Sequence, residues 1–144
     1  MVCAGRLDKD TEGLLVLTTD GDLAQRLTHP SKRVIKRYQV RVHRDLSSED
    51  IPKLLRGRTL EGQWLQFDRV IASKHSKTDF DVHLDHGKKR EIRRLLESFG
   101  YFVKKLKRIQ IGSYKMRGLA RGQAKPLRSS EIKEMLDSSA EEKR

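Results

Sequence analysis

The stretch that decides the fold is G-R-L-D-K-D-T-E-G-L-L-V-L-T-T-D-G, which runs from Gly5 to Gly21. It predicts an exposed corner that carries Asp8, with Arg6 two residues before it. The turn at residues 11–13 then leads into the apolar run 14–18, which we expect to be a buried strand. A carboxylate held on a loop beside an arginine indicates nucleophilic or electrostatic chemistry on an anionic substrate.

Composition points to a basic, globular protein that binds a polyanion. The chain has 144 residues, which is typical of one domain with a sizeable core. Its 32 Lys and Arg residues exceed its 20 Asp and Glu residues, so the formal net charge is +12. Nucleic acid is the first expectation for the partner. An anionic membrane is the weaker alternative, because no segment combines a bulky apolar face with a lysine-rich one.

Several classes of protein are disfavoured. The single cysteine, Cys3, and five scattered histidines argue against a disulfide framework, a zinc cluster or another metal site. No apolar run is long enough to span a bilayer, and the four residues before the motif are too short for a signal peptide. We therefore expect a cytoplasmic protein without a metal.

Hydrophobic periodicity predicts an α+β fold, with a mixed, mainly antiparallel sheet and flanking helices. Asp20 is expected to cap the first helix, and the capping-box-like segment 47–50 the second. Gly100 is expected to end the third helix, and Ser129 or Ser130 to cap the last. The predicted helices cover 21–28, 47–55, 89–98 and 129–136. The predicted strands cover 14–18, 34–43, 66–73, 78–84 and 101–111.

We expect one domain over 1–136 and a disordered polar tail over 137–144. The acidic motif begins at the fifth residue, although chain ends usually fray. The expectation is therefore either a piece of a longer chain or a local sheet that is completed by other means.

Three basic clusters recur along the chain. Residues 88–90 and 93–94 crowd the start of one predicted helix, where backbone donors and the helix dipole favour phosphate. Residues 104–108 place a second cluster on a strand, and residues 32–33 with 36–37 form a third. Each cluster alone is more often a solvated face. Their common sign favours a broad electrostatic footprint for a polyanion.

Tyr38 lies inside a basic strand, where an aromatic ring is suited to stacking on a splayed base. Its spacing alone favours a core position, because it shares a face with Val40 and Val42. Trp64 and Phe67 lie in a less charged region, and we predict that both are packing residues.

These stretches resemble a known family. G-R-L-D-K-D-T-E-G-L-L, at 5–15, resembles the signature of pseudouridine synthases of the RsuA-like ribosomal RNA group. Further stretches agree in the same order along nearly the whole chain. They are K-R-Y-Q-V at 36–40, G-K-K-R-E-I-R-R at 87–94, L-K-R-I-Q-I-G at 106–112, and the close from 118–119 to 126–128.

The resemblance implies an enzyme that isomerises a uridine of ribosomal RNA to pseudouridine without a cofactor or metal. Asp8 would be the catalytic aspartate, and its attack on the ribose or on the uracil ring stays open. Tyr38 would stack on the uracil, in contrast to the core position that spacing favours. Arg93 would pair with Asp8 and keep it ionised. Arg6 would occupy the space left by the flipped nucleotide.

The other basic residues would bind RNA under this resemblance. Lys88, Lys89 and Arg90 would serve phosphates. The remaining RNA-binding candidates come from the other clusters and are Lys36, Lys107 and Arg108. Glu91 stands where the family usually has glutamine, so its carboxylate would either compete with Asp8 for Arg93 or point to solvent.

The implied fold is the pseudouridine synthase catalytic fold, here without its N-terminal part. Family members normally have a strand with a Lys-Pro-x-Gly-like segment before the motif, and many carry an S4-type RNA-binding domain. The alternative function is therefore an inactive RNA-binding fragment or remnant of such an enzyme. A basic structural component of a ribonucleoprotein is a third hypothesis, but it does not require an acid at the loop corner.

Overall fold

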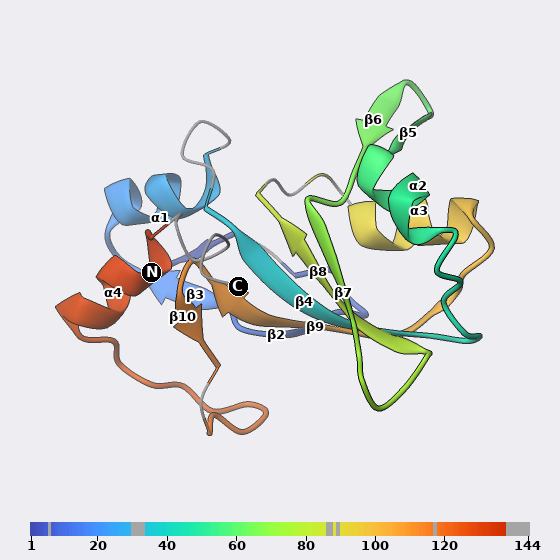
Figure 1. Cartoon of the computed structure of the whole chain (residues 1–144). Helices are drawn as coiled ribbons and strands as arrows, with labels where there is room; N and C mark the ends of the chain where they lie inside the picture. Colours follow the sequence, from blue (N-terminus) through green and yellow to red (C-terminus); the bar gives the residue numbers. More distant parts are fainter. Residues whose placement is uncertain (6, 30–33, 86–87, 89, 117, 138–144) are drawn as a thin grey trace.

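The computed structural model describes residues 1–5, 7–29, 34–85, 88, 90–116 and 118–137. Long strands form its centre, and the helices gather at the two ends of the sheet (Figure 1). The strands are β1 (Val2–Ala4), β2 (Glu12–Gly13), β3 (Val16–Thr18), β4 (Lys36–Val42), β5 (Arg58–Leu60), β6 (Gln63–Leu65), β7 (Arg69–Ala72), β8 (Asp79–Leu84), β9 (Val103–Ile111) and β10 (Tyr114–Lys115). The helices are α1 (Gly21–Thr28), α2 (Ile51–Arg56), α3 (Glu91–Ser98) and α4 (Ser129–Met135).

The main sheet has the order β10-β9-β4-β8-β7, and all of these neighbours are antiparallel. β2 adds to β9 in parallel. The predicted α+β class with a mixed, mainly antiparallel sheet is therefore confirmed. Within β4, Val40 and Val42 are buried and Tyr38 packs beside them, whereas Gln39 and Arg41 are exposed. This alternation gives the sheet one packed face and one polar face.

One hydrophobic core lies between the packed face of the sheet and helices α2 and α3. α3 begins at Glu91, slightly later than predicted, and its apolar stripe is buried at Ile92, Leu95 and Leu96. Gly100 follows the helix with φ +85°, the left-handed conformation that the predicted helix end requires.

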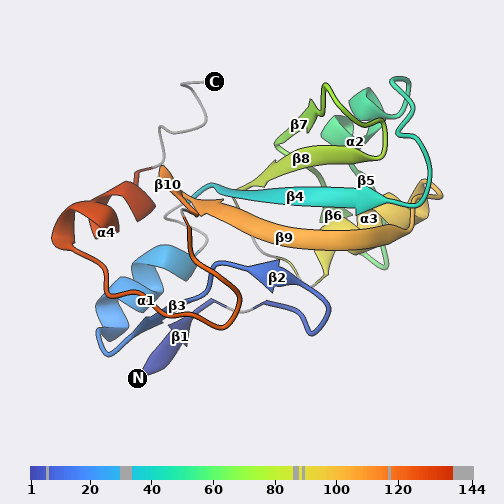
Figure 2. The same cartoon turned by 90° about the horizontal axis from the view of Figure 1, so that it is seen from below.

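A second core lies at the other end of the sheet, between α1, α4, β1 and β3 (Figures 1 and 2). The Asp20 side chain accepts hydrogen bonds from the backbone of Asp22 and Leu23 at 3.0 and 3.2 Å, which confirms the predicted cap. Leu27 is buried, and it packs in the same cluster as Val16.

The apolar run 14–18 was expected to be one buried strand, and this expectation is wrong. Only Val16–Thr18 is strand, and Leu15 and Leu17 are 45% and 54% exposed. The reason is the topology: β3 pairs with β1 in a two-stranded sheet, so the side of β3 that carries these leucines has no covering layer among the described residues.

The starts of α2 and α4 also differ from the predicted ones. Asp50 precedes α2 without a side-chain capping bond, because its carboxylate accepts a hydrogen bond from the Tyr101 hydroxyl instead. The last helix starts at Ser129, so this serine lies inside the helix rather than capping it. The preceding residue, Arg128, donates its backbone N–H to Glu131 at 3.0 Å.

The hairpin of β5 and β6 was not predicted. Its strands pair Arg58 with Leu65 and Thr59 with Trp64, and they follow α2 directly. Phe67, just after the hairpin, is completely buried, as expected of a packing residue. Trp64 is 48% exposed, so the prediction that it packs in the core is wrong.

Some predictions fall on residues that the structure does not describe. These are part of the turn at 85–87, the basic pair at 32–33, and residues 138–144 of the predicted tail. The proposed extent of the domain, 1–136, stays a prediction.

The segment between β1 and β2 that carries Asp8 is called the motif loop below. Gly13, at its end, joins this loop to β9. Leu14 donates its backbone N–H to the Arg108 carbonyl at 2.9 Å. The buried Arg108 side chain returns two hydrogen bonds to the Leu14 carbonyl, at 2.9 and 2.7 Å. Gly13 has φ +116°, and a Cβ there would lie 2.2 Å from the Arg108 carbonyl oxygen. Only glycine permits this close approach.

We expect Gly13→Ala to lower the free energy of unfolding by more than about 2 kcal/mol, since both strain and a backbone clash result. The control is Gly122→Ala, where φ is also positive (+80°) but no atom lies within 4 Å. It should lose about 1 kcal/mol or less. Urea denaturation measures both, and equal losses would contradict the close-approach argument.

Candidate active site

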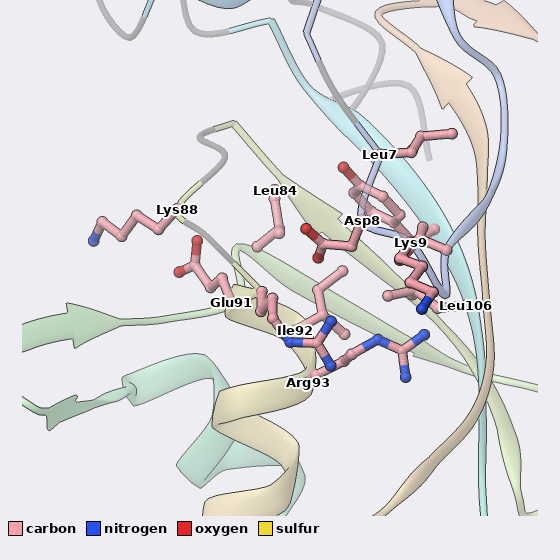
Figure 3. Close-up of a pocket in the computed structure, with 12 residues that line it drawn as sticks. Leu7, Asp8, Lys9, Leu84, Lys88, Glu91, Ile92, Arg93 and Leu106 are labelled. Atoms are coloured by element: carbon pink, nitrogen blue, oxygen red, sulfur yellow. The ribbon is translucent and has the colours of Figure 1, made fainter.

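A pocket of about 600 Å³ opens where the motif loop meets β4, β8, β9 and the start of α3 (Figure 3). Apolar side chains and charged groups alternate around it. Its lining residues are Leu7, Asp8, Lys9, Thr11, Tyr38, Leu84, Lys88, Arg90, Glu91, Ile92, Arg93 and Leu106. Such a mixture suits a ligand that combines a flat ring with negative charge.

Asp8 comes from the loop between β1 and β2. A turn holds this loop, because Thr11 donates its backbone N–H to the Asp8 carbonyl at 3.0 Å. Figure 3 shows the Asp8 carboxylate projecting into the pocket beside Leu84. With the residues that the structure describes, this carboxylate makes no hydrogen bond and no ion pair. It is therefore presented to whatever the pocket holds.

Tyr38 reaches the pocket from β4. It is half-buried and packs against the core cluster, as its spacing predicts, yet it also lines the pocket with Asp8. In register it lies opposite Val82 of β8 and Arg108 of β9. The central strand thus holds the ring firmly at the wall of the pocket.

Arg93 comes from α3 and is 7% exposed. Its predicted partner is Asp8, but the structure places Asp10 there instead. The Arg93 Nε lies 3.3 Å from the Asp10 carboxylate, and Nη2 donates to the Asp10 carbonyl at 2.6 Å. Asp10 follows Asp8 by two residues on the same loop, and it is the acid that reaches this part of α3.

Asp10 also binds Arg90. The Arg90 guanidinium donates to both carboxylate oxygens of Asp10, at 3.0 and 3.3 Å. These hydrogen bonds hold the pKa of the Asp10 carboxyl below its ordinary value, and the charge of Arg93 acts in the same direction. Sequence reasoning missed Asp10. The spacing Asp8-x-Asp10 is visible in the chain, but nothing local shows that residues 80 positions away lie opposite it.

Glu91 does not point to solvent, so that alternative is wrong. Its side chain is 2% exposed and lines the pocket, and one carboxylate oxygen accepts the backbone N–H of Gln66 at 3.2 Å. The residue therefore ties the first turn of α3 to the segment after β6.

The other predicted RNA-binding residues are divided between the pocket and the sheet. Lys88 and Arg90 line the pocket. Arg108 is buried, and its contacts with Leu14 hold the motif loop in place. Lys107 is half-buried in β9, beside Gln39 in the register of the sheet. Arg6 and Lys89 lie outside the described residues.

Lys36 lies next to the pocket, on the same strand face as Tyr38 and opposite Leu84 in register. Burial lowers the pKa of its ammonium group to about 8, and the charge of Arg108 contributes, while Asp85 acts in the opposite direction. A charged lysine is thus kept in a place that disfavours its charge. This arrangement is typical of a residue retained for function.

We expect Lys36→Met to raise the free energy of unfolding at pH 7 by about 1–2 kcal/mol, since the remaining contact of Lys36 with solvent screens part of the penalty. The folded pKa of about 8 lies below the ordinary value of 10.5. The penalty is therefore complete below pH 8 and disappears as the pH rises towards 10.5. Urea denaturation at pH 7 and pH 10 measures this difference.

The matched control is Lys104→Met, on the exposed part of β9. It should leave the free energy of unfolding unchanged at both pH values. An equal gain for Lys36→Met at pH 7 and pH 10 would contradict a buried charge at this position.

In the part of the chain that the structure describes, histidine, cysteine and acidic side chains do not gather in a group that could hold a metal ion. Likewise, none of the described helices combines the length and apolarity needed to cross a membrane.

The mixed sheet thus carries a pocket that brings together a carboxylate, an aromatic ring and arginines. Residues 1–98 match a family model described as RNA pseudouridylate synthase. The chain belongs to this family.

Individual relatives agree with this assignment. Ribosomal large subunit pseudouridine synthase B of Vibrio cholerae is 43% identical over 113 residues, which are 77% of this chain and 35% of the relative. An uncharacterized RNA pseudouridine synthase of Aquifex aeolicus is 39% identical over 133 residues, covering 92% of this chain and 55% of that protein. The chain thus spans about a third to about half the length of these relatives.

A solved structure agrees as well. The chain superimposes on a crystal structure of pseudouridylate synthase with a TM-score of 0.84 and 27% identity, over 92% of this chain and 58% of that one. The expected pseudouridine synthase fold is therefore confirmed over the aligned part.

Proposed function

We propose that this chain carries the catalytic site of a pseudouridine synthase that acts on a uridine of ribosomal RNA, with Asp8 as the catalytic aspartate. The observation that carries the proposal is the pocket, because Asp8, Tyr38 and Arg93 all line it. The names of the relatives support the RNA class of the substrate. A cytoplasmic location follows from that substrate.

The reaction requires little beyond positioning and one carboxylate. The bond from uracil N1 to ribose C1′ breaks, the ring turns, and C5 forms a bond to C1′. The C5 proton then leaves, and N1 gains a proton, so atoms and charge balance. Asp8 assists by attacking either the ribose or the ring, and both routes need its carboxylate ionised and within reach of the substrate inside the pocket.

The walls of the pocket suit a flipped uridine. Leu84, Ile92 and Leu106 offer apolar surface to the ring, and Tyr38 offers a face for stacking. The base cannot reach these groups while it is stacked in RNA, so the nucleotide must be extruded. The sugar would then bring C1′ next to Asp8.

The cations of the pocket suit the backbone of the RNA. Lys88 and Arg90 stand at the start of α3, where the positive end of the helix dipole also favours phosphates. Arg93 lies deeper and is bound to Asp10. We infer that Arg93 acts on Asp8 through the shape of this loop, or by exchanging partners when RNA binds.

One observation favours the alternative, a fragment that binds RNA without turnover. Arg93 and Arg90 are paired with Asp10, so Asp8 has no ion-pair partner in the described part of the chain. Salt-sensitive RNA binding without pseudouridine formation would support this alternative.

We expect Asp8→Asn to reduce pseudouridine formation by at least about a thousandfold, because the amide is a poor nucleophile and carries no charge. Tritium release from C5 of uridine in a ribosomal RNA transcript measures the turnover. The free energy of unfolding should change by less than about 0.5 kcal/mol, since the Asp8 carboxylate contacts no described hydrogen-bond partner.

Two substitutions with the same change of charge serve as comparisons. Asp22→Asn, on α1 and outside the pocket, should leave turnover unchanged. Asp10→Asn should lower turnover without abolishing it, because it releases Arg90 and Arg93 but keeps Asp8. Turnover that survives Asp8→Asn would overturn the catalytic assignment.

A further inference from the structure

Trp64 is an exposed aromatic residue that neither the core nor the pocket uses. It lies in β6, opposite Thr59, and 48% of its surface is exposed. The next residue, Leu65, is completely buried, so the hairpin turns one face inward and presents the indole outward. Tryptophan is enriched at binding surfaces, where its apolar ring and its polar N–H can both be used.

The backbone of Trp64 lies beside the rim of the pocket. Lys88, which lines the pocket, donates a hydrogen bond to the carbonyl of Trp64 itself. Glu91, which also lines the pocket, accepts the backbone N–H of Gln66, two residues further on. Figure 3 shows Lys88 and Glu91 together on the side of the pocket away from Lys9. The hairpin therefore continues the wall that these two side chains form.

The hairpin is fixed, so the indole is a rigid surface. Arg94 of α3 donates to the Gln63 side chain at 2.8 Å, and Arg58 donates to the Ser98 carbonyl at 3.2 Å. The Trp64 Nε1 donates to the Gln66 side chain at 3.4 Å. A ring that is already oriented loses little entropy when a ligand stacks on it.

We propose that Trp64 is a stacking platform for a nucleobase that flanks the target uridine. The proposal rests on the proposed function, and it extends the RNA site from the pocket onto the β5–β6 hairpin. A splayed base has an apolar face that fits an exposed indole, and its phosphates would pass the Lys88 end of the pocket. Every base has such a face, so this contact adds affinity with little sequence preference.

The chain supplies its own probe, because Trp64 is its single tryptophan. A short oligouridylate is titrated into the full chain at low salt, and the tryptophan emission is recorded. Stacking is expected to quench the emission and to saturate with binding. An abasic oligomer of the same length, which keeps the ribose phosphates but lacks bases, should bind more weakly and leave the emission unchanged.

Variants then measure the contribution to affinity, with anisotropy of labelled oligouridylate as the readout. Trp64→Ala should weaken binding by at least about fivefold, whereas Trp64→Phe keeps a stacking face and should lose less. Phe102→Ala is the matched control, since Phe102 is also exposed (59%) but packs beside His43, away from the pocket residues. Its affinity should equal that of the unchanged chain.

The outcomes separate the two proposals. If oligouridylate binds with unchanged emission and Trp64→Ala binds equally well, the stacking platform is wrong and the catalytic proposal stands. If emission is quenched but turnover is absent, the catalytic proposal fails and the platform stands. If no oligouridylate binds at low salt, both are overturned.

Discussion

The Asp10 carboxylate, bound to Arg90 and Arg93, is the contact on which the rest of the site depends. It joins the motif loop to the start of α3, across 80 positions of sequence. The loop is held a second time where Gly13 and Leu14 meet Arg108 of β9. Between these two attachments the backbone of Asp8 is held in place, and its carboxylate projects into the pocket (Figure 3).

The same contact explains the unusual backbone of Arg90. This residue precedes α3 with φ +49°, a backbone conformation that residues other than glycine seldom adopt. Such strain persists only where surrounding contacts outweigh it, and two hydrogen bonds to Asp10 supply them here. The start of α3 and the motif loop are therefore positioned together, and neither geometry is explained by its own sequence.

Local patterns predicted most of the fold, and the failures share one cause. Asp20, Gly100 and the apolar stripe of α3 act within a few residues, so the sequence around them is sufficient. The exposure of Leu17 and Trp64 depends on whether another layer covers them, and no local pattern reports that. Periodicity records which face is apolar but not which strand pairs beside it.

In the site, too, some features follow from the local sequence and others from packing between distant elements. The fold brings Asp8, Tyr38 and Arg93 to one pocket, and the roles that the resemblance implies for them stay predictions. Arg93 pairs with Asp10 and not with Asp8, although the two acids are only two residues apart on one loop. The order of residues in the sequence cannot show which of them reaches Arg93. The burial of Lys36 and Glu91 likewise depends on packing between distant elements.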